Sequence, residues 1–329
     1  MDPATRPAPA GHVPPRCFET MHLILPLAAH TDWPESLPDG RALPQLRRLL
    51  AGLQPTARLS DARDERPHPL LAHERLWAQT QGWPDAGPWP HAAHRSGQAG
   101  AQAWITPCHW QIGMDQVVML PPALLQLQDE ESQQLMQAMQ PWLAEDGLQL
   151  RWHDALHWHV QGPLLAQVSS ASLARVSGAN IRPWLTDGSL PGPLRRLQSE
   201  MQMLLYQHPV NDARLARGQL PINSFWLHGA GEARAGSAHS VVVHSELLDA
   251  AAQGPEAWRA AWQALDSTVL APLAAGAAPG ELQLSLCSQS TAITWVPGPR
   301  RWSQRLRQWL RPLDPVRAAL ALLIEEATP

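Results

Sequence analysis

The sequence predicts an α/β fold in which a mixed sheet is flanked by helices, and three observations carry this prediction. A short apolar strand at residues 22–27 is followed by an amphipathic helix at 43–53. A β-branched strand at 238–244 leads into a helix at 246–252. Two strands at 281–286 and 292–296 are joined by a polar turn, so we expect them to pair antiparallel.

Composition sets the expected domain organisation. Residues 1–20 are rich in Pro and Ala and have little to bury, so we expect them to be disordered. The chain has 329 residues and is 44% hydrophobic, which is ample for a core. We expect residues 21–329 to form a single α/β domain, which can divide into lobes at 21–147 and 148–329.

The remaining elements are predicted from the spacing of apolar residues and from the charged residues at their ends. Residues 60–69 are charged and irregular, whereas apolar spacing predicts a helix at 70–80. Acidic residues 129–131 open a further helix, because they complement its N-terminal dipole. The C-terminal stretch 300–327 has helical spacing, and we expect it to dock on the body rather than on a membrane. The predicted strands of this middle region cover residues 102–110, 117–120 and 148–160.

Residues 194–231 have the pattern most suggestive of a site. Apolar steps of three and four predict a helix that ends near His208, because Pro209 cannot continue the hydrogen-bond ladder. A polar turn, a short helical turn that carries Asp212 and Arg214, and a short strand at 222–227 follow. Residues near the ends of elements often carry function. The candidate ligand-binding residues of this stretch are Asn211, Arg214, Asn223, Ser224 and His228.

Arg175 and Arg182 are added as candidates for binding an anion, since a guanidinium recognises carboxylate and phosphate with two parallel hydrogen bonds. The competing interpretation is structural: the asparagines cap turns and the arginines form surface ion pairs. Arg214 separates these interpretations. We expect Arg214→Ala to melt near the parent protein and to lose ligand binding, whereas a structural guanidinium would leave a buried acceptor unsatisfied.

Catalytic and metal motifs are sparse. All 25 basic residues are Arg, and the missing lysine excludes a Walker A loop and Schiff-base chemistry. Cys108 and His109 are neighbours on a strand and therefore face opposite sides. His157 and His159 share a face with spacing suited to two metal ligands, but no further ligand follows with motif-like spacing. We expect no bound metal and no cofactor.

Charge and cysteine usage bound the partners and the location. The net charge of −4 gives no reason to expect a nucleic-acid partner. Three separated cysteines without a C-x-x-C pair fit a reducing cytoplasm. No apolar run has the length of a transmembrane segment, and no secretory signal is evident. A phosphorylated small molecule and a protein remain as candidate partners.

The run HPVNDAR at 208–214, followed by LPINSFWLHGAG at 220–231, resembles a segment of the archaeal-type cofactor-independent phosphoglycerate mutases. It looks still closer to the RpfE-type regulatory proteins of proteobacteria. The resemblance covers roughly residues 100–231. It implies an alkaline-phosphatase-like scaffold in which Asp and His residues hold two divalent ions.

The sequence departs from that pattern at the metal positions. The first strand ends without a carboxylate until Asp32, and residues 280–298 contain neither Asp nor His. Two metal ions require several carboxylates to offset their charge. We therefore expect a degenerate scaffold and a non-catalytic or regulatory function, with a remnant lobe that binds an anionic phosphorylated acid. The alternatives are an active phosphoglycerate mutase-like isomerase or phosphotransferase and a protein-interaction scaffold.

Overall fold

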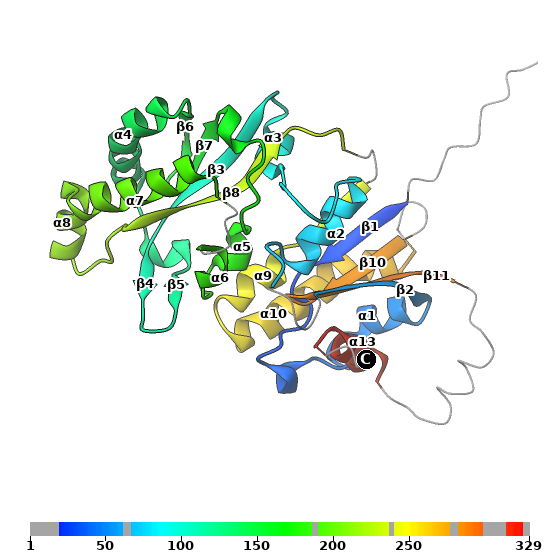
Figure 1. Cartoon of the computed structure of the whole chain (residues 1–329). Coiled ribbons are helices and arrows are strands. Elements are labelled where there is room, and N and C mark those ends of the chain that lie inside the picture. The colour runs from blue at the N-terminus through cyan, green and yellow to red at the C-terminus, as the bar shows by residue number, and fades with distance from the viewer. Residues whose placement is uncertain are drawn as a thin grey trace, which may run out of the picture.

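The computed structural model describes residues 20–61, 67–185, 190–236, 240–276, 282–298 and 314–324. Its main strands form two separate sheets, one of five strands and one of four. Each sheet carries its own helices, so the molecule has two lobes (Figure 1). The mixed α/β architecture with helices flanking a mixed sheet confirms the predicted fold class.

The five-stranded sheet defines the mixed-sheet lobe and has the order β2-β11-β10-β1-β9. Strand β1 pairs in parallel with both β10 and β9, whereas β11 is antiparallel to β10 and to β2. The carboxyl ends of β1, β2, β9 and β10 therefore lie at one edge of the sheet. These strands are β1 (Met21–Leu25), β2 (Leu53–Ser60), β9 (Ser240–Val243), β10 (Leu282–Cys287) and β11 (Thr291–Pro297).

Both faces of this sheet are covered. Leu23 and Leu25 contribute to the larger core, while Ile24 between them belongs to a smaller cluster with Ala72 of α2. Such alternation is expected for a strand buried on both sides. The helices of this lobe are α1 (Pro44–Leu50), α2 (Ala72–Thr80), α9 (Glu246–Ala251), α10 (Pro255–Leu265), α11 (Ala271–Ala274) and α13 (Pro315–Ile324), with a π-helical turn at Asp266–Leu270.

The four-stranded sheet defines the antiparallel lobe and has the order β6-β7-β3-β8. All its pairings are antiparallel. Residues Ala101, Ala103 and Ile105 of β3 join the core beneath the helices α4, α7 and α8. The elements are β3 (Ala101–Cys108), β6 (Gln149–Asp154), β7 (His157–Gln161), β8 (Ser224–Glu232), α4 (Asp129–Glu145), α7 (Gly192–Tyr206) and α8 (Pro209–Ala216).

Smaller elements complete the antiparallel lobe. A two-stranded hairpin of β4 and β5 projects beside the short helices α5 and α6 (Figure 1). These elements are β4 (Trp110–Ile112), β5 (Val117–Met119), α3 (His91–Ser96), α5 (Leu173–Val176) and α6 (Arg182–Leu185). The described part of the chain also contains the 3₁₀ turns Pro34–Ser36, Pro122–Leu125 and Pro163–Leu165.

Several sequence expectations differ from these elements. Strand β2 was not predicted, because as an edge strand it is largely exposed and lacks an apolar run. The short helical turn expected at Asp212 and Arg214 is part of α8, which begins earlier than expected because Pro209 is tolerated at the first helical position. A division at 147/148 runs through the four-stranded sheet, because β3 pairs with β7. Residues 1–19 and most of the expected helix at 300–327 lie outside the described residues.

No helix in the described ranges combines the length and apolar character required to cross a lipid bilayer.

Candidate functional site

The turn between α7 and β8 is held by Asn211. Its side-chain amide donates hydrogen bonds to the carbonyl oxygens of Leu205 and Ile222, each at 2.7 Å. Its side-chain oxygen accepts from the backbone N–H of Ile222, also at 2.7 Å. Asn211 is buried and uses both polar atoms to join the end of α7 to the segment that enters β8. This geometry is that of a structural clamp.

Arg214 is completely buried on the inner side of α8. Its Nη1 lies 2.6 Å from Oε2 of Glu131, at the start of α4. Its Nε donates to the carbonyl oxygen of Leu220 at 2.9 Å, and its Nη2 donates to that of Leu125 at 2.6 Å. All three nitrogens of the guanidinium are bonded to groups of the protein, so Arg214 ties three segments of the antiparallel lobe together.

The predicted residues in and just before β8 do not lie together. Asn223 pairs with the backbone of Trp110, accepting from its N–H at 2.7 Å and donating to its carbonyl oxygen at 3.0 Å. Ser224 accepts a hydrogen bond from Gln202 at 3.1 Å. His228 lies four residues further along the strand, a distance of about 13 Å at the usual rise. These residues do not form one pocket with Arg214.

His228 is buried and bonds through Nε2 to the hydroxyl of Thr106 at 3.1 Å. Burial lowers the pKa of His228 to about 3, and nearby imidazoles contribute in the same direction. The side chain is therefore neutral at physiological pH. A neutral, paired imidazole does not supply the positive charge expected of an anion-binding residue.

Arg175 lies at the junction between the two lobes. Its Nη2 contacts Oδ2 of Asp61 at 2.9 Å, and its Nε donates to the carbonyl oxygen of His68 at 2.8 Å. Arg75 of α2 contacts the other oxygen of Asp61 at 2.7 Å and binds Asp85 with two hydrogen bonds. One carboxylate therefore holds two guanidinium groups, of which one comes from each lobe.

Arg182 is placed elsewhere. Its Nη1 donates at 3.1 Å to the carbonyl oxygen of Asp115, in the turn of the β4-β5 hairpin. Arg182 therefore lies neither at the junction of the two lobes nor beside Asn211 and Arg214 of α8. Of the seven predicted residues, Asn211 and Arg214 lie on α8 with separate hydrogen-bond partners, whereas Arg175 belongs to the network at the junction.

Glu74 and Ser172 form another contact across the junction. Ser172 donates to Oε2 of Glu74 at 2.6 Å, and the backbone N–H of Leu71 donates to the same oxygen at 2.8 Å. Burial raises the pKa of Glu74 to about 7, although both hydrogen bonds act in the opposite direction. Ser172 is 1% exposed, so its hydroxyl is not accessible to a substrate.

The junction lies at the carboxyl edge of the mixed sheet. Asp61 directly follows β2, and the carbonyl oxygen of Gln289, in the turn after β10, accepts from the backbone N–H of Ala72 at 3.1 Å. In open α/β sheets this edge is where ligands bind. Asp61, Glu74 and Arg75 were not predicted as site residues. Charged residues at 60–75 are typical of a solvated loop and helix face, so their pattern did not indicate a buried network.

Histidines surround Trp104 on the sheet of the antiparallel lobe. The rings of His153, His157 and His159 lie 5.2, 6.0 and 5.3 Å from that of Trp104. Asp154 accepts from Nδ1 of His153 at 3.0 Å and of His157 at 2.8 Å. Within the described ranges, no group of three or more His, Cys, Asp or Glu side chains is arranged to hold a metal ion.

Cys108 and Cys287 are buried, and burial raises the pKa of both thiols. His109 points away from Cys108 and contacts the carbonyl oxygen of Pro221 at 2.8 Å. The predicted lack of pairing between Cys108 and His109 agrees with these contacts. Neither cysteine is in the thiolate form that acts as a nucleophile.

Comparison with protein-family models and with curated proteins gave no match. Among solved structures, the PH0037 protein from Pyrococcus horikoshii has a TM-score of 0.44 and 10% identity, covering 85% of this chain and 87% of that one. A cofactor-independent phosphoglycerate mutase from Thermoplasma acidophilum has a TM-score of 0.34 and 13% identity, covering 93% of this chain and all of that one. These likenesses are distant, and the fold class rests on the sheets described above.

Proposed function

We propose that this chain is a non-catalytic, regulatory protein that binds a phosphorylated acid at the junction of its two lobes. The supporting observation is the convergence of Arg75 and Arg175 on Asp61. Their side chains are 8% and 9% exposed, so both guanidinium groups are largely withdrawn from water. Charge-assisted hydrogen bonds are strongest in such surroundings.

The chemistry of the pair suggests the ligand class. A phosphorylated acid carries a phosphate and a carboxylate, and each of these groups matches the donor geometry of one guanidinium. Asp61 occupies the place of such an anion in the ligand-free arrangement. Of the residues predicted from sequence, we assign Arg175 to this site, whereas Asn211, Arg214 and Asn223 support the fold.

Competition with Asp61 makes the proposal testable. Asp61→Asn keeps the shape of the side chain but removes the charge that occupies the guanidinium groups. We expect this variant to bind 3-phosphoglycerate more tightly than the parent protein does, by roughly tenfold for one charge-assisted hydrogen bond. Arg175→Ala should abolish binding. Isothermal titration calorimetry with 3-phosphoglycerate and with inorganic phosphate measures both effects.

Arg196→Ala is the matched control, since Arg196 forms an ion pair with Asp146 at 2.8 Å, and its side chain is 59% exposed. This variant should bind 3-phosphoglycerate as the parent does. Absence of binding in both the parent and Asp61→Asn would contradict the anion site. Turnover of 3-phosphoglycerate in the presence of Mn²⁺ would instead favour the active phosphoglycerate mutase-like alternative. Partner binding without any small-molecule response would favour the interaction scaffold.

A further inference from the structure

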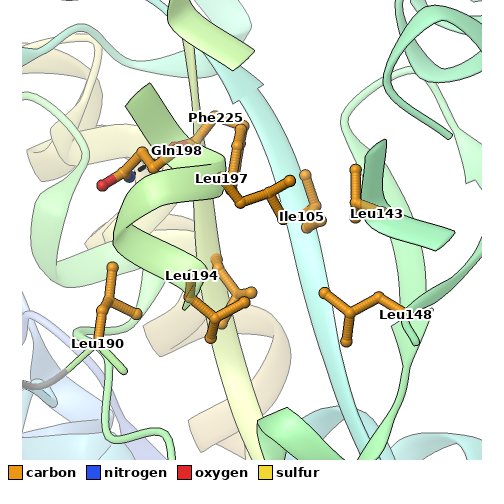
Figure 2. Close-up of a pocket in the computed structure, with 9 residues that line it drawn as sticks. Ile105, Leu143, Leu148, Leu190, Leu194, Leu197, Gln198 and Phe225 are labelled. Carbon is orange, nitrogen blue, oxygen red and sulfur yellow. Dashed lines mark hydrogen bonds between the residues drawn. The ribbon is translucent and has the colours of Figure 1, made fainter. Parts of the chain in front are cut away.

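The two lobes do not share a hydrophobic core. The described residues form four apolar clusters, and each cluster draws its members from one lobe alone. Figure 2 shows such packing within the antiparallel lobe, where Leu143 and Leu148 lie on one side of Ile105 and Leu194 and Leu197 of α7 lie on the other. Relative motion is the usual behaviour of two lobes that lack a large apolar interface.

Polar contacts from residues 172–175 join the antiparallel lobe to the mixed-sheet lobe. The backbone N–H of Ser172 donates to the carbonyl oxygen of Pro69 at 2.9 Å, and the hydroxyl of Ser172 donates to Glu74 at 2.6 Å. Arg175, one turn further along α5, contacts Asp61 at 2.9 Å. Hydrogen bonds of this kind can be exchanged for hydrogen bonds to water, so they can open without exposing apolar surface.

The chain crosses between the lobes twice, and the two crossings lie together. It enters the antiparallel lobe between α2 and α3 and leaves that lobe after β8. A Cβ atom added to Gly231, near the end of β8, would lie 3.1 Å from Cβ of Pro88 and 3.0 Å from Cβ of Pro90 in the entering segment. Beside this segment, the ring of Trp77 of α2 meets that of His94 of α3 at 5.1 Å. Two neighbouring crossings form a single hinge about which lobes can turn.

Glu74 makes the contact at the junction that a proton can change. The residue is 9% exposed, and its carboxyl group accepts hydrogen bonds from Ser172 and from the backbone N–H of Leu71. The nitrogens of Arg75 and Arg175 are bonded to other acceptors, so neither guanidinium pairs with Glu74. A buried carboxylate without a cation is costly, because it has lost its hydration. An ionised Glu74 therefore favours an arrangement that admits water to the junction.

We propose that the junction is a proton-operated latch. While the carboxyl group of Glu74 is protonated, the contacts between α2 and residues 172–175 hold the two lobes closed. Loss of this proton to solvent water favours an open state, in which these contacts are broken and Glu74 is hydrated.

The pH range of the latch follows from Glu74 and its neighbours. Burial raises the pKa of Glu74 from 4.5 to about 7, so the closed state is favoured most below pH 4.5 and progressively less as the pH rises to about 7. Burial lowers the pKa of His73 to about 4 and also lowers that of His68, so both imidazoles are mostly neutral near pH 7. The charged or titratable groups around Glu74 are Arg175 of α5, His73 and Arg75 of α2, Asp61 and His68 before α2, and Asp85 after it.

The latch does not require the anionic ligand proposed for the junction. Opening depends on Glu74, whereas the ligand takes the place of Asp61 between Arg75 and Arg175. Binding of 3-phosphoglycerate and opening of the ligand-free protein are measured separately, so either proposal can fail while the other stands.

Amide hydrogen exchange of the full-length protein measures the opening, because the amide of Ser172 donates to Pro69 across the junction. After correction for the intrinsic effect of pH, we expect the protection of this amide to fall by roughly 10- to 100-fold between pH 5.5 and pH 8. Glu74→Gln cannot ionise, so its protection at Ser172 should not depend on pH. Glu130→Gln, at an exposed position of α4, is the matched control and should behave as the parent protein does.

The amide of Ile105 distinguishes opening of the junction from unfolding of the chain. Ile105 lies in the central strand β3, where it is opposite Trp158 on one side and Leu227 on the other. At both pH values we expect its amide to be protected at least roughly tenfold more than that of Ser172. Equal protection and equal pH dependence of the two amides would mean that Ser172 exchanges only through global unfolding, which would overturn the latch. A Ser172 amide whose protection in the parent does not depend on pH, or depends on it equally in Glu74→Gln, would overturn it as well.

Discussion

Arg214 on α8 and the pair Ser170 and Trp184 bury polar groups of the same lobe in opposite ways. Arg214 is completely buried, and every nitrogen of its guanidinium contacts an acceptor of the protein. Ser170 and Trp184 bury a donor each and satisfy neither. A polar group that is fully paired inside the chain contributes to stability, whereas an unpaired buried one costs stability. This pairing makes Arg214 structural, whereas Arg75 and Arg175 of the junction, which are also paired within the chain, would have to exchange Asp61 for a ligand.

The largest effect expected from this comparison is that of Arg214→Ala. The substitution leaves Glu131 without its buried partner and frees the carbonyl oxygens of Leu125 and Leu220. Breaking a buried ion pair in this way typically costs about 3 to 5 kcal/mol of unfolding free energy. The sequence-based expectation of near-native melting is therefore reversed for this variant. Urea denaturation followed by far-UV circular dichroism measures the loss.

Arg217→Ala supplies a matched control for that measurement. Arg217 is 50% exposed and pairs with the same Glu131 carboxylate. Exposed pairs are worth about 0 to 1 kcal/mol, so this variant should remain close to the parent protein. If Arg214→Ala lost no more stability than Arg217→Ala, the buried contacts of Arg214 would not be structural.

Glu74 differs from both cases. Its carboxyl group is buried and accepts two hydrogen bonds, but burial still disfavours the charged form. Its pKa is raised by burial from 4.5 to about 7. The folded state therefore retains a proton that the unfolded state has released between these two pH values. Stability from this group is fully present below pH 4.5 and is lost as the pH rises toward 7. The total change is about 3 kcal/mol at 1.36 kcal/mol per pKa unit.

Glu74→Gln cannot ionise, so it should remove this part of the pH dependence. We expect the difference in unfolding free energy between pH 5 and pH 8 to be smaller in the variant than in the parent. Glu130→Gln, at an exposed position of α4, should leave the pH dependence unchanged. Identical pH profiles for Glu74→Gln and the parent protein would contradict the raised pKa.

Asn223→Ala should have an intermediate effect. The substitution removes both hydrogen bonds to the backbone of Trp110, which joins β8 to the β4-β5 hairpin. Leaving these partly buried groups unpaired is worth about 1 to 3 kcal/mol. Chemical denaturation measures the loss, and hydrogen exchange of the Trp110 amide tests its location. An unchanged exchange rate at Trp110 would mean that the hairpin is held by other contacts.

The smallest effect expected is that of Ser170→Ala in the ligand-free protein. Its hydroxyl makes no hydrogen bond among the described residues, so its removal should change the free energy of unfolding by less than about 0.5 kcal/mol or raise it slightly. A thermal melt without added ligand is sufficient. A clear loss of stability would show that the hydroxyl is bonded in the native state.

The sequence predicted those parts of the fold that depend on local patterns. The apolar spacing of residues 194–208 agrees with α7, and the turn chemistry before 291 agrees with the antiparallel pairing of β10 and β11. Strand β2 was not predicted, because its stability depends on pairing with β11, a strand more than 230 residues away in the sequence. Register between distant segments is not encoded in a local period.

The candidate site was less predictable for a related reason. The polar groups of residues 208–231 were expected near element ends, but only Asn223 and Ser224 lie there, since Asn211 and Arg214 are within α8 and His228 is within β8. Whether Arg214 turns toward solvent or toward Glu131 depends on the packing of α4 against α8. The spacing of residues within 208–231 does not predict this packing. The contact between Arg175 and Asp61 similarly joins residues 114 positions apart.

The pairing of the first and last strands of the antiparallel lobe has a consequence for modularity. Ala101, at the start of β3, is opposite Glu232, at the end of β8. The chain therefore enters and leaves this sheet at adjacent points, separated by about 5 Å. Such a layout is that of an inserted domain within a host sheet, whose strand order is completed by segments on either side of the insertion. The pairings of β1 with β9 and β10 therefore do not pass through the inserted sheet, whereas removal of the inserted lobe would leave Glu74 and Asp61 without Ser172 and Arg175.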